Sequence, residues 1–207
     1  MYIPKHFEVS DVPKLVSFIR DNSFGILFSQ NDGLPFATHL PLLIEQTTEG
    51  DWQLTGHMAR SNPHHAYIAS QGAPVLAVFQ GPHAYISPSW YEEPNTVPTW
   101  NYVAVHVYGE FAAITDEEEL AAMMKRTIDR YESSMPEPWT TELDSGFNRQ
   151  LMQAIVGFKI RVTRFEGKWK LSQNHTGERR QKVIAALRQQ GYPDAEKIAE
   201  LMYKIGE

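Results

Sequence analysis

The feature that most constrains the fold of this chain is an alternating run from Tyr102 to Tyr108. Its valines, at positions 103, 105 and 107, fall on one face of an extended chain, whereas Tyr102, Ala104, His106 and Tyr108 fall on the other. A period of two residues is typical of a half-buried β-strand. The chain is therefore expected to contain a sheet whose core covers the valine face.

The turn that leads into this strand, residues 97–102, is rich in aromatic and amide side chains. Flat aromatic and amide groups at the mouth of a β-structure are suited to a planar heterocyclic ligand. We therefore expect Asn101 to hydrogen-bond the polar edge of a flavin-like ring, and Trp100 or Tyr102 to pack on that ring. The alternative interpretation is a cluster of aromatic residues at a barrel corner.

The rest of the chain predicts a mainly β fold with peripheral α-helices. The strands are expected at residues 24–30, 34–45, 52–57, 75–80, 84–88, 100–114, 156–163 and 168–171. The helices are expected at residues 11–20, 63–71, 117–131 and 147–154, and in the tail. Asn31-Asp32-Gly33 and Glu166-Gly167 are expected to be turns. Because the pattern lacks a βαβ rhythm, it predicts an antiparallel barrel of about six strands rather than a Rossmann sheet.

Composition shifts at Gly177, and this divides the chain into residues 1–175, a barrel domain, and 176–207, a helical appendage. The appendage is predicted to be two short helices broken at Gly191-Tyr192-Pro193. It superficially resembles a helix-turn-helix, but its six basic and five acidic residues give a net charge of only +1. We expect its apolar residues to pack on the barrel or on a partner subunit: Val183, Ile184, Leu187, Ile198, Leu201, Met202 and Ile205.

Several classes of function are disfavoured by composition. The chain has no cysteine, which excludes disulfides and thiolate chemistry and fits the cytoplasm. Its net charge of −6 gives no general attraction to nucleic acid or to an anionic membrane. There is no apolar run of about 18 residues and no secretory signal at the N-terminus, so no membrane association is expected. The eight histidines show no metal-binding spacing, and no serine hydrolase motif is present.

The strongest candidate binding cluster lies where a predicted strand ends and a predicted helix begins. It contains His57, Arg60, Ser61, Asn62 and His64. Amide groups at a helix N-terminus attract anions, and arginine is a bidentate donor to phosphate. The cluster is therefore a candidate phosphate-binding site. The alternative is that Ser61 or Asn62 only caps the helix and that Arg60 is a surface residue.

Two further segments are candidate walls of a cofactor site. Residues 80–91 join two predicted strands and include Trp90, which would wall a cofactor or, alternatively, pack beneath a loop. Residues 168–175 combine cations, an aromatic residue and amides near the end of the barrel, with Lys170 and Gln173 as the candidates. The alternative for this second segment is a solvated hairpin.

Taken together, these motifs resemble the PaiB family, the FMN-binding negative transcriptional regulators of bacteria. The resemblance covers nearly the whole chain and rests on the following segments: Met1-Tyr2-Ile3-Pro4, His39-Leu40-Pro41, Gly56 to His64, Ile86 to Tyr91, Val97 to Tyr102, and Lys170 to Asn174.

The resemblance implies an antiparallel FMN-binding split β-barrel, like that of pyridoxamine-phosphate oxidases, and a homodimer that holds FMN between its subunits. It also implies repression of sporulation and of extracellular protease genes. We expect any direct contact with DNA to be weak or indirect. A flavin-dependent oxidoreductase or a haem-handling protein of the same fold is the alternative, with haem in place of FMN, and its substrate contact would come from His83, His106 or Trp90.

Overall fold

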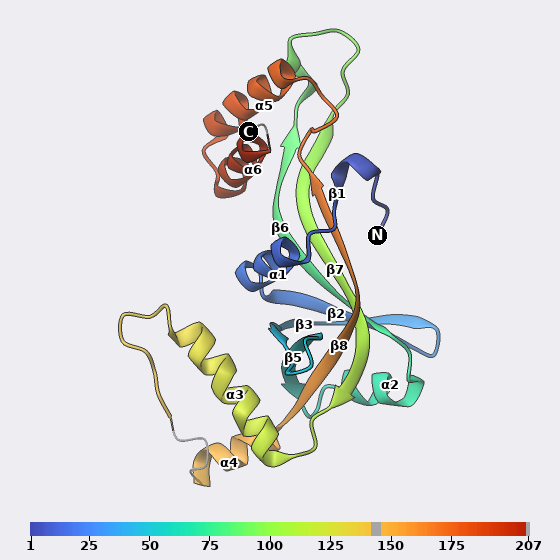
Figure 1. Cartoon of the computed structure of the whole chain (residues 1–207), viewed down its shortest axis with the longest axis vertical. Helices are drawn as coiled ribbons and strands as arrows, with labels where there is room; N and C mark the ends of the chain where they lie inside the picture. Colours follow the sequence, from blue (N-terminus) through green and yellow to red (C-terminus); the bar gives the residue numbers. More distant parts are fainter. Residues whose placement is uncertain (142–145, 206–207) are drawn as a thin grey trace. The chain divides into compact units, whose positions relative to one another are not determined.

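The computed structural model describes residues 1–141 and 146–205 of the 207-residue chain (Figure 1). The strands are β1 (Glu8–Val9), β2 (Phe24–Asn31), β3 (Leu34–Pro41), β4 (Leu43–Gln46), β5 (Trp52–Ala59), β6 (Val75–Ile86), β7 (Thr99–Ala113) and β8 (Ile155–Lys170). The α-helices are α1 (Val12–Asp21), α2 (His64–Gln71), α3 (Glu117–Glu132), α4 (Gly146–Gln153), α5 (Gly177–Gln190) and α6 (Pro193–Lys204). Short 3-10 helices span Lys5–Phe7 and Pro88–Tyr91.

The strands form one sheet in the order β3-β2-β6-β7-β8-β5-β4, with β1 paired to β8. The pairs β1–β8, β2–β3, β2–β6, β4–β5 and β5–β8 are antiparallel. A mainly antiparallel β fold with peripheral helices is thus confirmed. The described residues contain eight strands. Two of them, β3 and β4, were expected as one strand at residues 34–45 and are separated by Leu42.

Contacts along the chain divide it into two units. The terminal unit consists of Met1–Leu15, Phe79–His106 and Phe165–Glu207. The inner unit consists of Val16–Val78 and Val107–Arg164. Strands β6, β7 and β8 contribute residues to both units, and each unit is described below by itself. The predicted boundary at residue 175 stays a prediction.

The inner unit is built on two antiparallel pairings. In the hairpin of β2 and β3, Asn31 is opposite Leu34, and the turn residues Asp32 and Gly33 have φ angles of 50° and 80°. The left-handed conformation explains why Asp and Gly occupy this turn. Strand β5 pairs with β8 along its length, and the side chains of Leu54 and Phe158 are fully buried.

The alternating run from Tyr102 to Tyr108 is a strand, as predicted. Val103, Val105 and Val107 in β7 have no exposed surface, and the intervening residues are half-buried. Helix α3 begins at Glu117, as expected. Asp116 is its N-cap and accepts a hydrogen bond of 2.8 Å from the backbone N–H of Glu119.

Two predicted breaks in strands were wrong. Gly81-Pro82 lies inside β6, and Glu166-Gly167 lies inside β8. Gly167 is required by close packing rather than by a turn, since a Cβ there would come within 2.7 Å of the Val9 carbonyl oxygen and 2.3 Å of a Leu15 methyl group. A glycine at a close backbone approach gives the same sequence signal as a glycine in a turn.

In the terminal unit, α5 and α6 pack against each other and are separated as the sequence predicted. Thr176 caps α5 by accepting a hydrogen bond from the Arg179 N–H, and Gly191 ends it with a φ angle of 69°. The buried residues of the two helices include Val183, Leu187 and Ile198. None of the helices described in residues 1–141 and 146–205 has the length and hydropathy needed to cross a membrane.

Candidate functional site

The junction between β5 and α2, in the inner unit, is organised by Asn62. The backbone N–H of Asn62 donates to the Ala59 carbonyl at 2.9 Å, which closes a tight turn through Arg60 and Ser61. The Asn62 side-chain oxygen accepts a hydrogen bond of 3.0 Å from the N–H of His64, the first residue of α2. Ser61 remains exposed at the outside of this turn. Asn62 therefore shapes the junction.

His64 is fully buried and fastens α2 to the hairpin of β2 and β3. Its Nδ1 lies 2.7 Å from the Thr38 hydroxyl and its Nε2 lies 2.9 Å from the Ser29 hydroxyl. The ring also packs against Phe36, with centroids 4.8 Å apart. Burial lowers the pKa of His64. With both ring nitrogens engaged inside the unit, His64 supports the junction in this conformation.

The guanidinium of Arg60 holds the junction to the segment that follows α4. Its Nε donates to the Gln153 carbonyl at 2.6 Å and its Nη2 donates to the Ile155 carbonyl at 2.8 Å. Arginine carries five N–H donors, so these two bonds leave donors available to a ligand. Arg60 is therefore both a structural residue and an exposed cation at the turn.

His57 precedes this turn, on β5. Its Nδ1 is buried, and among the described residues, 1–141 and 146–205, no group hydrogen-bonds to it. Burial lowers the pKa of His57, which favours the neutral imidazole. A buried polar atom without a partner is costly, and native proteins usually supply that partner from a bound molecule, water or another chain.

A cavity of about 820 Å³ adjoins the junction within the inner unit. Arg60 and His65 line it, and residues from the start of α3, the end of α4 and the start of β8 complete it: Ala113, Ile114, Thr115, Asp116, Glu117, Glu118, Leu120, Ala121, Met152, Gln153, Ile155 and Val156. The volume suits a cofactor, but the three carboxylates at the start of α3 oppose a phosphate group there. The exposed turn, not this cavity, is the better phosphate site.

The terminal unit holds the predicted aromatic residues. Trp100 is 52% exposed and packs edge-on against Tyr85, with ring centroids 5.8 Å apart. Tyr102 is half-buried, and the ammonium group of Lys168 lies 5.1 Å from its ring centroid. Trp90 is half-buried in the 3-10 helix Pro88–Tyr91. Trp100 is thus the most exposed aromatic side chain of this set.

The predicted amide and cation of the terminal unit make internal contacts. Asn101 is fully buried, and its side-chain nitrogen donates to the Ser172 hydroxyl at 3.0 Å and approaches the Met202 sulfur at 3.3 Å. Lys170 donates to the Thr99 hydroxyl and, at 2.7 Å, to the Trp100 carbonyl. Burial and the neighbouring Lys168 lower the pKa of Lys170. These contacts fix the backbone from which Trp100 projects.

Gln173 bonds only within its own turn among the described residues. Its amide nitrogen donates to the Trp169 carbonyl at 2.6 Å, and its oxygen accepts from the Leu171 N–H at 2.7 Å. Gln173 therefore shapes the end of β8.

The structure brings five of the predicted residues together at the junction in the inner unit and places six in the terminal unit. Their convergence on one ligand stays a prediction. The sequence argument did not select His65, although it belongs to the same motif, and His65 lines the cavity with Arg60. Two adjacent histidines could have revealed His65, because neighbouring side chains point in different directions. His64 is buried, whereas His65 is only partly buried.

Comparison with known proteins identifies the family and the relatives of this chain. A family model described as "Putative FMN-binding domain" matches residues 1–164. The chain is 40% identical over 205 residues to "Protease synthase and sporulation protein PAI 2" of Bacillus subtilis, covering 98% of this chain and 96% of that protein. It is 34% identical over 159 residues to an uncharacterized protein of Saccharomyces cerevisiae, covering 66% and 94% of the two.

Two solved structures share the fold. The flavocytochrome Anf3 from Azotobacter vinelandii has a TM-score of 0.62 at 14% identity, covering 85% of this chain and 73% of that one. An FAD and haem binding protein from Mycobacterium smegmatis has a TM-score of 0.63 at 15% identity, covering 86% and 79%. At these identities the likeness concerns the fold alone.

Proposed function

Since this chain belongs to the PaiB family of FMN-binding-domain proteins, we propose that it is a flavin-binding regulator that holds FMN at the junction of β5 and α2. When bound, FMN supplies a redox-active ring, and the protein supplies binding and orientation. The protein acts in this proposal as a cytoplasmic homodimer, with FMN between the subunits.

The buried Nδ1 of His57 is the observation that carries the proposal. It lies at the end of β5, beside the turn, and the described part of the chain offers it no hydrogen-bond partner. A bound flavin would supply that partner. Arg60 and the exposed Ser61 are assigned to the phosphate, while Asn62 and His64 position the turn.

The aromatic residues Trp90, Trp100 and Tyr102 are assigned to the flavin ring, supported by the backbone that Asn101, Lys170 and Gln173 fix. Trp100 is the residue of this group with the most accessible ring. Stacking on an exposed indole suits an isoalloxazine ring.

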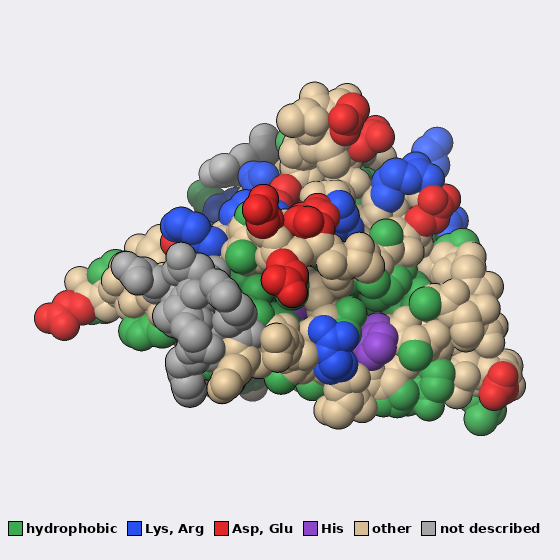
Figure 2. Space-filling model, turned by 90° about the horizontal axis from the view of Figure 1, so that it is seen from below, with side chains coloured by type: hydrophobic (Ala, Val, Ile, Leu, Met, Phe, Trp, Pro, Cys, Tyr) green, Lys and Arg blue, Asp and Glu red, His purple; other side chains and the backbone are tan. Residues whose placement is uncertain are grey.

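We propose further that the protein is a negative regulator of sporulation and of extracellular protease genes; the name of the Bacillus subtilis relative mentions protease synthesis and sporulation. Figure 2 shows a face where Lys and Arg side chains are interspersed with Asp and Glu side chains. Such mixing gives little attraction to a phosphate backbone. Weak or indirect contact with DNA is therefore expected, and a tight, salt-sensitive gel shift by the purified protein alone would contradict that expectation.

The binding site is tested by titrating FMN into the wild-type protein and into two variants, His57→Leu and Arg60→Ala. Loss of a charge-assisted phosphate contact is worth roughly 1.5–3 kcal/mol, so Arg60→Ala should weaken FMN binding by about tenfold or more. His57→Leu should weaken it too, because the ligand loses its partner. Flavin fluorescence gives the dissociation constants, and circular dichroism checks that each variant is folded.

Arg161→Ala is the matched control, since Arg161 is an exposed arginine of the same unit, 2.6 Å from Glu110. This variant also removes one positive charge, but at a site outside the junction, and should leave FMN affinity unchanged. If His57→Leu and Arg60→Ala bind FMN as tightly as the wild type, the junction is not the flavin site.

A further inference from the structure

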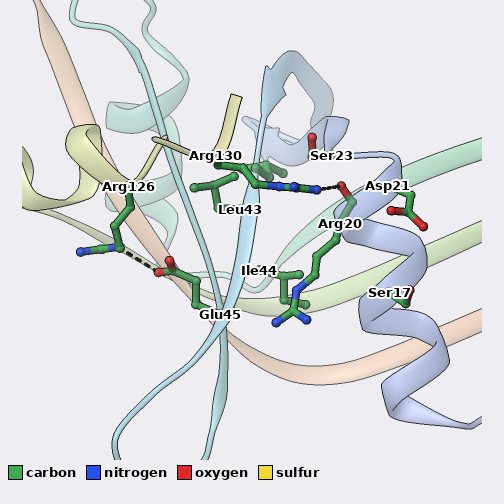
Figure 3. A pocket seen from close by; sticks show the side chains of 10 residues that line it. Ser17, Arg20, Asp21, Ser23, Leu43, Ile44, Glu45, Arg126 and Arg130 are labelled. Atoms are coloured by element: carbon green, nitrogen blue, oxygen red, sulfur yellow. Dashed lines mark hydrogen bonds and ion pairs between the residues drawn. The ribbon is translucent and has the colours of Figure 1, made fainter. Parts of the chain in front are cut away.

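A second cavity of the inner unit, of about 420 Å³, lies where α1, β4 and α3 meet (Figure 3). Arginines reach it from two helices: Arg20 from the end of α1, and Arg126 and Arg130 from α3. The other lining residues are Ser17, Asp21, Ser23, Leu42, Leu43, Ile44 and Glu45. None of the residues assigned to FMN lines this cavity.

Two of the three arginines are held in place by internal partners. The Nε of Arg126 lies 3.2 Å from the Glu45 carboxylate. The Nη2 of Arg130 donates to the Arg20 carbonyl at 3.0 Å, which satisfies the end of α1. Figure 3 draws both contacts. The guanidinium of Arg130 is therefore oriented by a backbone bond that leaves its charge uncompensated.

Arg20 differs from the other two. Within residues 1–141 and 146–205, no hydrogen bond or ion pair engages its guanidinium. Asp21 is the second carboxylate of the lining, so the cavity carries three positive and two negative charges. One of the two carboxylates, Glu45, is already paired with Arg126.

The apolar part of the cavity lining is buried and held by hydrogen bonds to neighbouring elements. Leu42 has no exposed surface, and Leu43 and Ile44 are no more than 9% exposed. The backbone N–H of Leu42 donates to the Ser23 carbonyl at 2.8 Å, and the Ser23 hydroxyl lies 2.8 Å from that of Tyr131. Arg20 and Arg130 thus line one cavity beside a buried apolar surface (Figure 3), and guanidinium groups are strong donors to oxyanions.

From this arrangement we propose that the cavity binds a small oxyanion, a phosphate or carboxylate group, with the guanidinium of Arg20 as the principal donor and Arg130 as the second. A planar guanidinium matches both groups in a bidentate manner. The anion would offset the excess of one positive charge among the lining residues. The site would give the protein a ligand besides the flavin.

The test is isothermal titration calorimetry of the whole chain at low ionic strength in chloride buffer, because salt screens exposed charges. Inorganic phosphate, pyrophosphate and succinate are the three probes. Saturable binding of at least one probe at one site per chain is expected. Binding of the phosphates but not of succinate would identify a phosphate site, and binding of succinate alone would identify a carboxylate site. The absence of saturable binding with all three probes would overturn the proposal.

Variants distinguish anion binding in this cavity from a general effect of protein charge and from binding at the flavin site. Arg20→Ala should lower the affinity for the probe that binds by about tenfold or more. Arg20→Lys should lower this affinity less, because lysine keeps the charge but lacks the planar guanidinium. Arg161→Ala should change nothing. Equal losses in Arg20→Ala and Arg161→Ala, or a loss of FMN affinity in Arg20→Ala, would overturn the proposal of a separate oxyanion site.

Discussion

At the scale of single residues, the junction shows how one histidine can look like a ligand donor and act as a support. His64 lies in a motif suited to phosphate binding, yet its ring is bonded to Ser29 and Thr38, which are 35 and 26 residues away in the sequence. The sequence predicted that the motif matters. It could not predict that the His64 ring is a structural support, because the hydrogen-bond partners of the ring lie in β2 and β3, far away in the sequence.

His64 has a consequence for the pH dependence of stability. Burial lowers its pKa in the folded protein, whereas the unfolded chain takes up a proton with a pKa of about 6.5. The unfolded state therefore binds more protons as the pH falls below about 6.5, and the free energy of unfolding decreases until the pH reaches the folded pKa. Replacing His64 with Gln should make this decrease shallower between pH 7 and pH 5.

Urea denaturation at a series of pH values measures this slope. His57, His106 and His175 also have lowered pKa values, so part of the slope remains in the variant. The exposed His39→Gln variant is the control. If His64→Gln and the wild type lose stability in parallel, His64 does not titrate as its burial implies.

At the scale of elements, Gly109 shows a close approach that no local pattern reveals. A Cβ at this position of β7 would lie 2.4 Å from the carbonyl oxygen of Arg161 in β8. Backbone cannot yield as a flexible side chain can. Gly109→Ala should therefore lower the free energy of unfolding by about 1–3 kcal/mol.

Gly177→Ala is the matched control for this substitution. A Cβ at Gly177, the first residue of α5, meets no described atom within 4 Å. Thermal denaturation of the two variants checks the prediction. If Gly109→Ala is as stable as Gly177→Ala, the two strands are not packed as closely as described.

The elements also show what sequence patterns can and cannot reveal. Alternation predicted β7, and Gly191 after α5 together with Pro193 at the start of α6 predicted the break between these helices. Gly81-Pro82 was misread as a break between two strands and Glu166-Gly167 as a turn, because a glycine inside a strand and a glycine in a turn carry the same local signal. Only the neighbouring strand, such as β1 beside Gly167, distinguishes them.

At the scale of the whole molecule, the fold class and the family were predictable, because they depend on many positions at once. The binding residues were harder to predict, since five lie in one unit and six in the other. The arginine cavity left no sequence signal at all. Arg20 and Arg130 are 110 residues apart, and only the folded chain brings them together.

The central claim is that this chain binds FMN, and titration of the purified protein with FMN tests it most directly. Flavin fluorescence and absorbance would follow the titration, and sedimentation of the saturated sample would give the oligomeric state. The account predicts saturable binding, micromolar or tighter, of one FMN per subunit in a dimer. A folded dimer that does not bind FMN would contradict it.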